Sequence, residues 1–363
     1  MNPDPLRVRL GERSYDVVVT TGALDGVGPF ARAGTKGVSA LIVTDTNAAP
    51  HAEAVRRSLE QAGFRTVLAA RPPGEAQKSL DIARELYDAL LNMRADRKTL
   101  VAAVGGGVVG DLAGFVASTY ARGLPLLMVP TTLLAMVDSA IGGKVAVNHP
   151  RAKNLIGTFH QPIGVWIDTA TLDTLPPREY CSGLAEVVKC GVVLDADLFT
   201  YVEEAAAAIL KRDPEAVRRI VVRCCELKAG IVEQDERDET GLRAMLNYGH
   251  TFAHAFETAG GYEGWLHGEA VAAGMVCASR LAERHRLLGA QVTERQIRLL
   301  REFGLPTAPA RWPIDQLIET MRRDKKSAGG KMRLILPRGL GQVALYDNVQ
   351  EGDVRQVLEE AMV

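Results

Sequence analysis

Two histidines and two other polar residues recur at helical spacing within one short stretch of the chain. They are Arg243, Asn247, His250 and His254. Because these positions are four, three and four residues apart, a helix would place all four side chains on one face. The neighbouring residues are rich in Ala, Phe, Met and Leu, and burying a polar row among them without partners would cost free energy. The row therefore favours a ligand or metal site, whereas a single histidine there would more often be a core residue.

Two histidines four residues apart can share a zinc ion. Thr251 follows His250, so the metallopeptidase pattern H-E-x-x-H is absent. Another histidine, His267, stands at the expected start of a further helix. Imidazole nitrogens and a carboxylate oxygen can fill three zinc positions and leave room for substrate oxygens. Spacing alone leaves the remaining ligands open among Glu186, Glu269, His254 and His267.

Glu186 and Lys189 form a second pair that a helix would place on one face. They are three residues apart in the segment LAEVVK, among apolar neighbours. The ordinary explanation is an intrahelical ion pair, which is worth roughly a few tenths of a kcal/mol. The pair is a candidate for the same site without establishing it.

A glycine-rich turn follows the apolar run LVAAV that begins at Leu100. Residues Gly105 to Asp111 match G-x-G-x-x-G at a predicted strand-to-helix junction, where backbone can approach a pyrophosphate. An ordinary Rossmann unit has an acidic ribose ligand about 20 residues later, but that region reads LLMVP here. Asp45, at the end of the run LIVTD, can meet a ribose if neighbouring strands share the crevice. The turn thus predicts nucleotide binding with a non-standard strand order, although such turns also serve only to pack a helix on a strand.

Basic residues recur in glycine-rich or loop-like contexts: Arg122, Lys144, Lys153, Lys228, Lys325 and Lys326. Lys78 adds another cation at the end of the loop PPGEAQK, for which a helix-capping turn is an equally good explanation. Solvated charge is the ordinary explanation of each. Their placement outside regular helix faces favours an anion site. A small substrate with both a carboxylate and a phosphate would use this many cations.

Strand and helix patterns alternate through the first half of the chain. The runs LRVRL and YDVVV flank a turn and predict an opening β-hairpin. The apolar runs LIVTD, FRTVLAA, LVAAV and PLLMVP then alternate with stretches of helical period, which predicts a parallel sheet with helices on both faces. Helical segments dominate after about Pro176. We therefore expect an α/β fold, with a Rossmann-like domain over residues 1–170 and a mainly α-helical, metal-binding domain over residues 178–363.

The composition suits a globular protein of two domains, with 363 residues of which 47% are hydrophobic and 24% charged. The formal net charge of -1 provides no global positive field for nucleic acid or an anionic membrane. No apolar run reaches the roughly 18 residues that span a bilayer, and the N-terminal stretch lacks the apolar core of a signal peptide. Five cysteines without a C-x-x-C pair fit free thiols in a reducing compartment. We expect a cytoplasmic protein that binds neither nucleic acid nor membrane.

Six segments, in this order, resemble the 3-dehydroquinate synthase family: GGGVVGDLAGFVASTYARG, VPTTLLAMVDSAIGGKVAVNHPRAKNLIGTFHQP, SGLAEVVKCG, DERDETGLRAMLNYGHTFAHAFE, WLHGEAVAAGM and RDKK. The resemblance extends from about Asp45 to Pro337. It implies zinc, with cobalt as an alternative metal, bound by Glu186, His250 and His267. It also implies a homodimer in which Arg122 reaches the substrate phosphate in the neighbouring subunit. One departure is Pro73, which stands where the family often has an acidic or polar residue.

The same resemblance implies the residues of the cofactor and substrate sites. Those for NAD are Asp45, Gly74, Glu75, Ala76, Gln77, Lys78, Gly107, Val108, Val109, Gly110, Asp111, Thr131, Thr132, Lys144, Lys153, Thr171, Leu172, Asp173 and Thr174. Those for the substrate are Arg122, Asp138, Lys144, Lys153, Asn154, Lys189, Lys228, Arg243, Asn247, His254, Lys325 and Lys326. The expected catalytic residues among them are Lys144, Lys189, Arg243, Asn247 and His254.

The family reaction converts 3-deoxy-D-arabino-heptulosonate 7-phosphate to 3-dehydroquinate and phosphate in the shikimate pathway. It combines transient oxidation by NAD, phosphate elimination, re-reduction and intramolecular aldol closure. Alternatives are another sugar phosphate cyclase, an NAD-dependent metal polyol dehydrogenase, and a catalytically silent NAD-binding or scaffolding protein. Arg243, Asn247 and Lys228 favour a carboxylated substrate. A silent protein would not need the three implied zinc ligands together.

Overall fold

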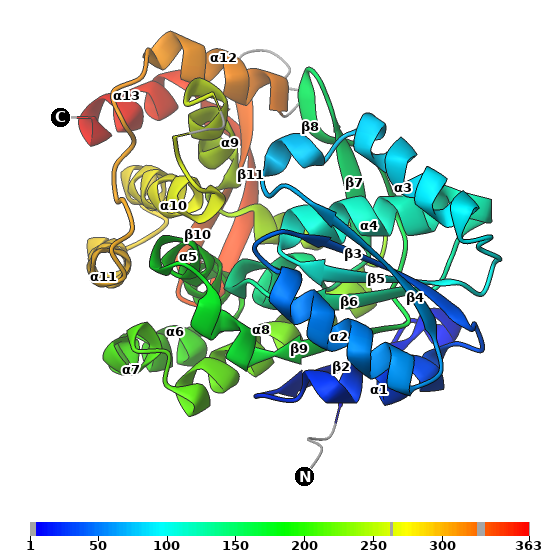
Figure 1. The fold of residues 1–363 in the computed structure, drawn as a ribbon. Coiled ribbons are helices and arrows are strands. Elements are labelled where there is room, and N and C mark those ends of the chain that lie inside the picture. The colour runs from blue at the N-terminus through cyan, green and yellow to red at the C-terminus, as the bar shows by residue number, and fades with distance from the viewer. Residues whose placement is uncertain (1–4, 262–263, 325–330, 363) are drawn as a thin grey trace. The chain divides into compact units, whose positions relative to one another are not determined.

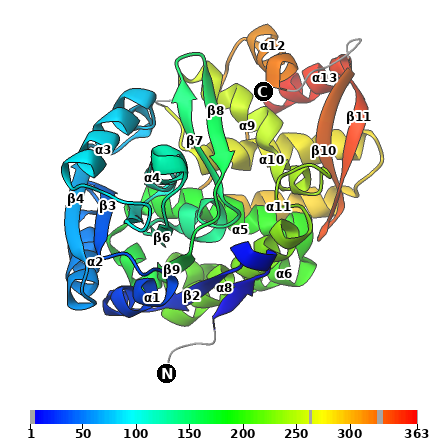
Figure 2. The ribbon, with the colours of Figure 1, turned by 90° about the vertical axis from the view of Figure 1, so that its right-hand side faces the viewer.

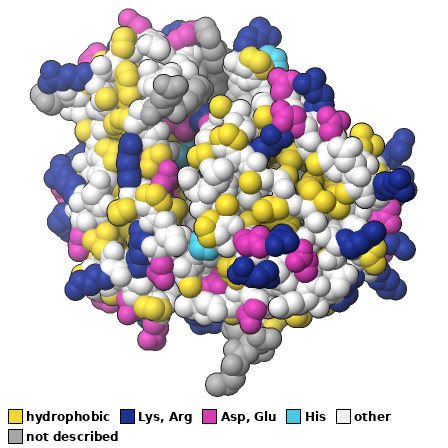
Figure 3. Space-filling view, in the orientation of Figure 1, with side chains coloured by type: hydrophobic (Ala, Val, Ile, Leu, Met, Phe, Trp, Pro, Cys, Tyr) yellow, Lys and Arg dark blue, Asp and Glu magenta, His cyan; other side chains and the backbone are white. Residues whose placement is uncertain are grey.

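The computed structural model describes residues 5–261, 264–324 and 331–362. The chain forms two compact units. Unit 1 comprises Met1–Leu175 and Val217–Arg237, and unit 2 comprises Pro176–Ala216 and Asp238–Val363. None of the helices that the structure describes combines the length and apolar character that crossing a bilayer requires. On the face drawn in Figure 3, basic and acidic side chains are interspersed, in line with the net charge of -1.

A seven-stranded sheet forms the centre of unit 1, with the strand order β1-β2-β9-β6-β5-β3-β4 (Figure 1). Its strands are β1 (Leu6–Val8), β2 (Tyr15–Thr20), β3 (Ser39–Asp45), β4 (Arg65–Arg71), β5 (Leu100–Gly105), β6 (Leu126–Pro130) and β9 (Gly164–Asp168). β1 and β2 are antiparallel, and the other neighbouring pairs are parallel. The predicted α/β class, opening hairpin and parallel sheet are therefore confirmed, whereas β9 was not among the predicted strands.

Helices cover both faces of this sheet (Figures 1 and 2). On one face, α1 (Val27–Gly34) and α2 (Ala49–Gln61) share a hydrophobic core with residues of β3, β5 and β6. On the other face lies α4 (Gly107–Thr119), with α3 (Leu80–Asn92) packed beside it. Side chains alternate along a strand, so each residue of β5 meets one helical layer or the other, and all are buried. This double burial explains why β3, β5 and β6 appear in the sequence as nearly continuous apolar runs.

Two further elements belong to unit 1. The hairpin of β7 (Lys144–His149) and β8 (Ala152–Phe159), which was not predicted, packs against α4. Most of α8 (Pro214–Gln234) is also part of this unit, although it lies in the half of the sequence expected to form the helical domain. Short helical turns complete the unit: η1 (Gly11–Arg13), η2 (Leu24–Gly26), η3 (Glu75–Gln77), η4 (Tyr120–Arg122), the π-helical η5 (Ala135–Ser139) and η6 (Thr169–Thr174).

Unit 2 is mainly helical, as predicted, and is organised around α10 (His267–Arg284). This helix packs against α5, α9, α11 and α13, and its residues 270–279 are all buried. The remaining helices are α5 (Pro177–Leu194), α6 (Ala196–Glu204), α7 (Ala206–Leu210), η7 (Arg243–Asn247), α9 (His250–Ala259), α11 (Ala290–Glu302), α12 (Ile314–Asp324) and α13 (Glu351–Ala361). An antiparallel hairpin, β10 (Lys331–Gly339) and β11 (Gln342–Gln350), was not predicted.

Candidate active site

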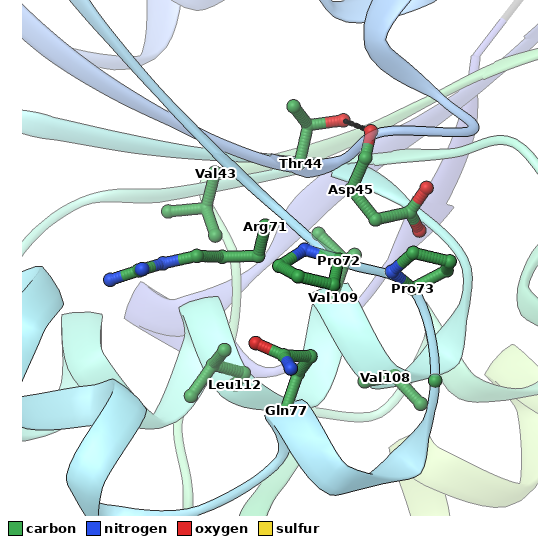
Figure 4. A pocket seen from close by; sticks show the side chains of 11 residues that line it. Val43, Thr44, Asp45, Arg71, Pro72, Pro73, Gln77, Val108, Val109 and Leu112 are labelled. Carbon is green, nitrogen blue, oxygen red and sulfur yellow. Dashed lines mark hydrogen bonds between the residues drawn. The ribbon is translucent and has the colours of Figure 1, made fainter.

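A pocket in unit 1 lies at the carboxyl ends of β3 and β4, beside the first turns of α4 (Figure 4). β3 contributes Val43 to Asp45, the loop after β4 contributes Pro72 to Gly74, and α4 contributes Val108 and Val109. Figure 4 shows the Asp45 carboxylate near Pro73 at one side of this pocket. The pocket thus brings together three of the segments expected to hold NAD.

The strand order explains how Asp45 comes to lie beside the glycine turn. β3 pairs in parallel with β5, so both strands end at the same edge of the sheet. The condition set for Asp45, that its strand neighbours the one before the glycine turn, is therefore met. The Asp45 carboxylate accepts hydrogen bonds from the backbone N–H groups of Asn47 (2.8 Å) and Ala48 (3.0 Å), which holds it at the strand end. α4 begins directly after Gly106, so its unpaired first N–H groups lie at this edge and can meet an anion.

A polar network joins the loop after β4 to the β7–β8 hairpin. The Lys78 ammonium is buried and donates to Asp111 of α4 and to the Asn154 side chain of β8. Asn148 of β7 donates to Glu75 (2.7 Å) and accepts from the backbone N–H of Asn154 (2.9 Å). Burial raises the pKa of the Asp111 carboxyl, and the Lys78 charge opposes this rise. Asn148 was not singled out in the sequence, yet it links a segment expected to bind NAD with one expected to bind substrate.

Further residues expected at the NAD site follow the ends of β6 and β9. Thr131 is buried and donates its backbone N–H to Gly105 (3.0 Å). Thr132 accepts from the backbone of Ala135, which fixes the turn into η5. In η6, the hydroxyl of Thr174 bonds His51 Nε2 of α2 (2.8 Å). Burial lowers the pKa of His51. This histidine was not singled out in the sequence.

Several cations expected to bind substrate also lie in unit 1. Lys228 of α8 is buried and ion-paired with Asp138, another residue on the expected substrate list. Lys144 is exposed at the start of β7, and Lys153 is half-buried on β8. Arg122 is exposed in η4 with a left-handed backbone (φ 69°).

In unit 2, Glu186 of α5, His250 of α9 and His267 of α10 come together as a possible metal site. One ligand atom from each lies within 4.8 Å of the others. The Nε2 atoms of His250 and His267 are 3.7 and 3.6 Å from Glu186 Oε1. Zinc ligands about 2.1 Å from a tetrahedral ion would be about 3.4 Å apart, so one ion fits this set. The structure therefore selects among the candidates that spacing had left open.

The other two candidates lie outside this cluster. Glu269 is held by a bidentate ion pair with Arg178, at 2.6 and 2.7 Å, and accepts from the backbone N–H of Leu266 at the start of α10. The ring of His254 lies edge-on to that of His250, with centroids 5.8 Å apart. His254 is therefore near the metal ligands without being one of the cluster.

Two close backbone contacts place the histidines. The Gly268 N–H donates to Ser182 Oγ of α5 (3.0 Å), and a Cβ on Gly268 would lie 1.9 Å from the Ser182 carbonyl oxygen. Ser182 lies one helical turn before Glu186, so this contact brings the start of α10, and with it His267, beside the carboxylate. Gly249 has a positive φ of 79° and packs on the backbone of Met275 in α10, which directs His250 to the same place.

This break at Gly249 corrects one sequence prediction. The polar row does not lie on one continuous helix, because η7 ends at Asn247 and α9 starts at His250. The left-handed conformation of Gly249 and its close packing on α10 interrupt the helix. Arg243 is buried, and Asn247 and His254 are half-buried. Lys325 and Lys326 lie outside the described residues.

The electrostatics of the cluster differ between the two histidines. Burial, reinforced by Lys189, lowers the pKa of His250 to about 3, so this imidazole is neutral and its nitrogen can bind a metal. Burial also acts to lower the pKa of His267, but Glu186 and Glu257 outweigh it and raise the pKa to about 10. The buried Lys189 ammonium is ion-paired with the second oxygen of Glu186. The predicted Glu186–Lys189 pair therefore exists, but inside the protein.

Each histidine has a partner at its other ring nitrogen. His250 Nδ1 lies 3.2 Å from the carbonyl oxygen of Tyr248, and His267 Nδ1 lies 3.4 Å from Oε1 of the buried Glu257. Glu257 was missed in the sequence, although it follows His254 by three residues and so continues the spacing of the polar row. Extending that row by one step would have found it.

Comparison with known proteins identifies the family to which these residues belong. The family model of the 3-dehydroquinate synthase N-terminal domain matches residues 68–182, and that of the C-terminal domain matches residues 183–327. A curated 3-dehydroquinate synthase of Desulforamulus reducens is 49% identical over 357 residues, which are 98% of this chain and 99% of that protein. The chain belongs to the 3-dehydroquinate synthase family.

Solved structures of related cyclases share the family's fold. A 2-deoxy-scyllo-inosose synthase complexed with carbaglucose-6-phosphate, NAD+ and Co2+ is 26% identical, with a TM-score of 0.90 over 99% of this chain and 100% of that one. A 2-epi-5-epi-valiolone synthase of Streptomyces hygroscopicus with NAD+ and Zn2+ bound is 30% identical, with a TM-score of 0.88 over 97% and 98% of the two chains.

Proposed function

We propose that this protein is a phosphate-eliminating carbon–oxygen lyase that converts 3-deoxy-D-arabino-heptulosonate 7-phosphate to 3-dehydroquinate, as a step of the shikimate pathway. The observation that carries the proposal is the convergence of Glu186, His250 and His267 in a chain 49% identical to a curated 3-dehydroquinate synthase. The pocket between Asp45 and the glycine turn provides a place for NAD. The metal ion and the NAD that the reaction requires thus both have candidate binding residues.

The donor set suits zinc, with cobalt as the alternative, because it combines one carboxylate and two imidazoles. We assign NAD to the domain of residues 1–170, through Asp45, the loop 74–78, the turn 107–111, Thr131, Thr132, Lys144 and Lys153, together with the segment 171–174 that follows this domain. We assign zinc and most of the substrate contacts to the domain of residues 178–363. When bound, zinc polarises substrate hydroxyls and NAD accepts and returns a hydride.

The chain's own residues would bind and orient the substrate. The proposed contacts are Arg122, Asp138, Lys144, Lys153, Asn154, Lys189, Lys228, Arg243, Asn247, His254, Lys325 and Lys326. The cations among them would neutralise the carboxylate and the leaving phosphate. The buried Lys189 ammonium would hold the Glu186 carboxylate in its charged form, and Asn247 and the His254 imidazole would handle protons near the metal.

We also propose a cytoplasmic homodimer in which Arg122 completes the site of the neighbouring subunit. Arg122 is exposed at the end of α4, and its left-handed backbone directs the chain into a turn. All five cysteines are free thiols, which suits a reducing compartment.

A second candidate is another sugar phosphate cyclase, because the solved cyclases superpose with TM-scores of 0.88 and 0.90. Their identities of 30% and 26% are well below the 49% of the curated 3-dehydroquinate synthase. The buried Arg243 supports a carboxylated substrate over a neutral one.

The decisive experiment measures phosphate release and NADH absorbance in one cuvette, with the heptulosonate phosphate, zinc and a catalytic amount of NAD. We expect phosphate to match substrate consumed without accumulation of NADH, and no reaction with the Glu186→Gln variant. Sustained NADH production would identify a dehydrogenase instead. Phosphate release only from sedoheptulose 7-phosphate would identify another cyclase.

A further inference from the structure

Glu257 is a buried carboxylate that faces a proposed metal ligand from behind. It is 6% exposed, and its Oε1 lies 3.4 Å from Nδ1 of His267. The opposite nitrogen of the same ring, Nε2, lies 3.6 Å from Glu186 Oε1. The imidazole of His267 is therefore held between two carboxylates, one on the metal side and one on the far side.

This arrangement determines which nitrogen can bind a metal. A neutral imidazole has one N–H and one lone pair, and a carboxylate can only accept a hydrogen bond. In the neutral form of His267 that binds a metal, Glu257 at Nδ1 keeps the N–H on Nδ1 and leaves the lone pair on Nε2, which lies on the Glu186 side. We propose that Glu257 is a positioning residue that sets the tautomer and ring orientation of His267, and thereby the affinity of the site for a divalent metal.

The two histidines differ in how much they depend on such support. The side chain of His250 is 10% exposed, whereas that of His267 is 33% exposed. His250 also has a backbone partner, the Tyr248 carbonyl oxygen, which no side-chain substitution removes. His267 is the first residue of α10, and its more exposed ring is less constrained by packing. Removing Glu257 should therefore lower the metal affinity of the site.

The location of Glu257 on α9 makes it suited to this task. It lies seven residues, or about two turns, after His250, so the two side chains share one face of the helix. α9 thus supplies one ligand directly and positions the other. Because the side chains of His250 and Glu257 both belong to α9, the position of His250 and the orientation of His267 would be fixed by the same helix.

The test measures zinc affinity by competition with a chromophoric chelator, without substrate. We expect affinity to fall in the order wild type, Glu257→Gln, Glu257→Ala, with a loss of about 10- to 100-fold in the alanine variant. Glutamine retains an acceptor oxygen, so its affinity should be intermediate. The exposed Glu302→Gln change in the same unit is the matched control and should leave affinity unchanged.

A second readout separates positioning from general damage. NAD affinity should be the same in all variants, because the proposed NAD residues lie in unit 1. Unchanged zinc affinity in Glu257→Ala, or parallel losses of zinc and NAD affinity, would overturn the proposal. Loss of zinc binding in Glu186→Gln verifies the metal site itself, so a failure there is distinguishable from a failure of the role given to Glu257.

Discussion

At the scale of single residues, His250 and His267 show how the same side chain acquires opposite properties. Burial beside Lys189 lowers the pKa of His250 to about 3, while two carboxylates raise that of His267 to about 10. At pH 8 and without a bound metal, His250 is therefore a neutral imidazole and His267 is an imidazolium with both nitrogens protonated. A metal ion would bind through the lone pair of one nitrogen on each histidine, so both rings must be neutral when the metal is bound.

We predict that zinc uptake at pH 8 releases about one proton per site, from His267. Because this proton competes with the metal, zinc affinity should rise with pH and level off above about pH 10, the pKa of His267. Calorimetric titration in buffers of different ionisation enthalpy counts the released protons. Zinc binding at pH 8 without proton release would show that His267 is neutral in the metal-free protein.

Residue types and spacing in the sequence were sufficient to bring His250 and His254 into consideration, but not to choose the ligands. Glu186 and Glu269 both fall in segments of helical pattern among apolar residues, and the sequence does not distinguish them as metal ligands. The difference lies in three dimensions, since Glu269 pairs with Arg178 while Glu186 faces both histidines. The family resemblance supplied that choice in advance.

At the scale of elements, the metal cluster depends on the contact between α10 and α5. The backbone of Gly268 lies directly on that of Ser182, with no space for a side chain. Backbone cannot move aside as a flexible side chain can. The start of α10 would therefore have to shift away from Glu186 if a Cβ were added.

We predict that Gly268→Ala weakens zinc binding and lowers the free energy of unfolding by about 1–3 kcal/mol, as overpacking does. Gly352→Ala is the matched control, because nothing lies within 4 Å of its added Cβ in α13. It should leave zinc binding intact and be neutral or stabilising by up to about 1 kcal/mol. Chelator competition and denaturant unfolding measure the two effects. Equal zinc affinities in both variants would show that the α5–α10 contact does not place His267.

The elements themselves were predictable where their patterns are long or buried. The strands β3, β5 and β6 are nearly continuous apolar runs because the sheet is covered on both sides there. The hairpin strands β8 and β11 are largely exposed and carry mixed residues, so their alternation is weak. The break at Gly249 depends on packing against α10, a contact more than 20 residues away in sequence. Local patterns do not contain that information.

At the scale of the whole molecule, the order of the chain and the order of the units differ. α8 follows three helices of unit 2 in sequence, yet most of it belongs to unit 1. Lys228 on this helix pairs with Asp138 of unit 1, and Glu233 accepts from the backbone of Arg9. A single boundary near residues 170–178 describes the composition of the two halves, but long-range contacts such as these are not visible in composition.

The proposed homodimer makes a prediction about mixtures of inactive variants. Arg122→Ala lacks the residue donated to the neighbour, and Glu186→Gln lacks a metal ligand in its own chain. In a heterodimer, the zinc site of the Arg122→Ala chain receives Arg122 from the Glu186→Gln chain. Random reassociation makes about half of the dimers mixed, each with one complete site, so activity should recover to about a quarter of wild type.

Phosphate release after denaturation and joint refolding measures this recovery, and native mass spectrometry counts the mixed dimers. The control is Glu186→Gln with His267→Ala, two variants defective in the same metal site, because every metal site in their mixed dimers still lacks one ligand. This pair should stay inactive although it forms mixed dimers equally well. If Arg122→Ala and Glu186→Gln form mixed dimers without activity, Arg122 does not act across the interface, and if Arg122→Ala alone retains full activity, it is not needed at the site at all.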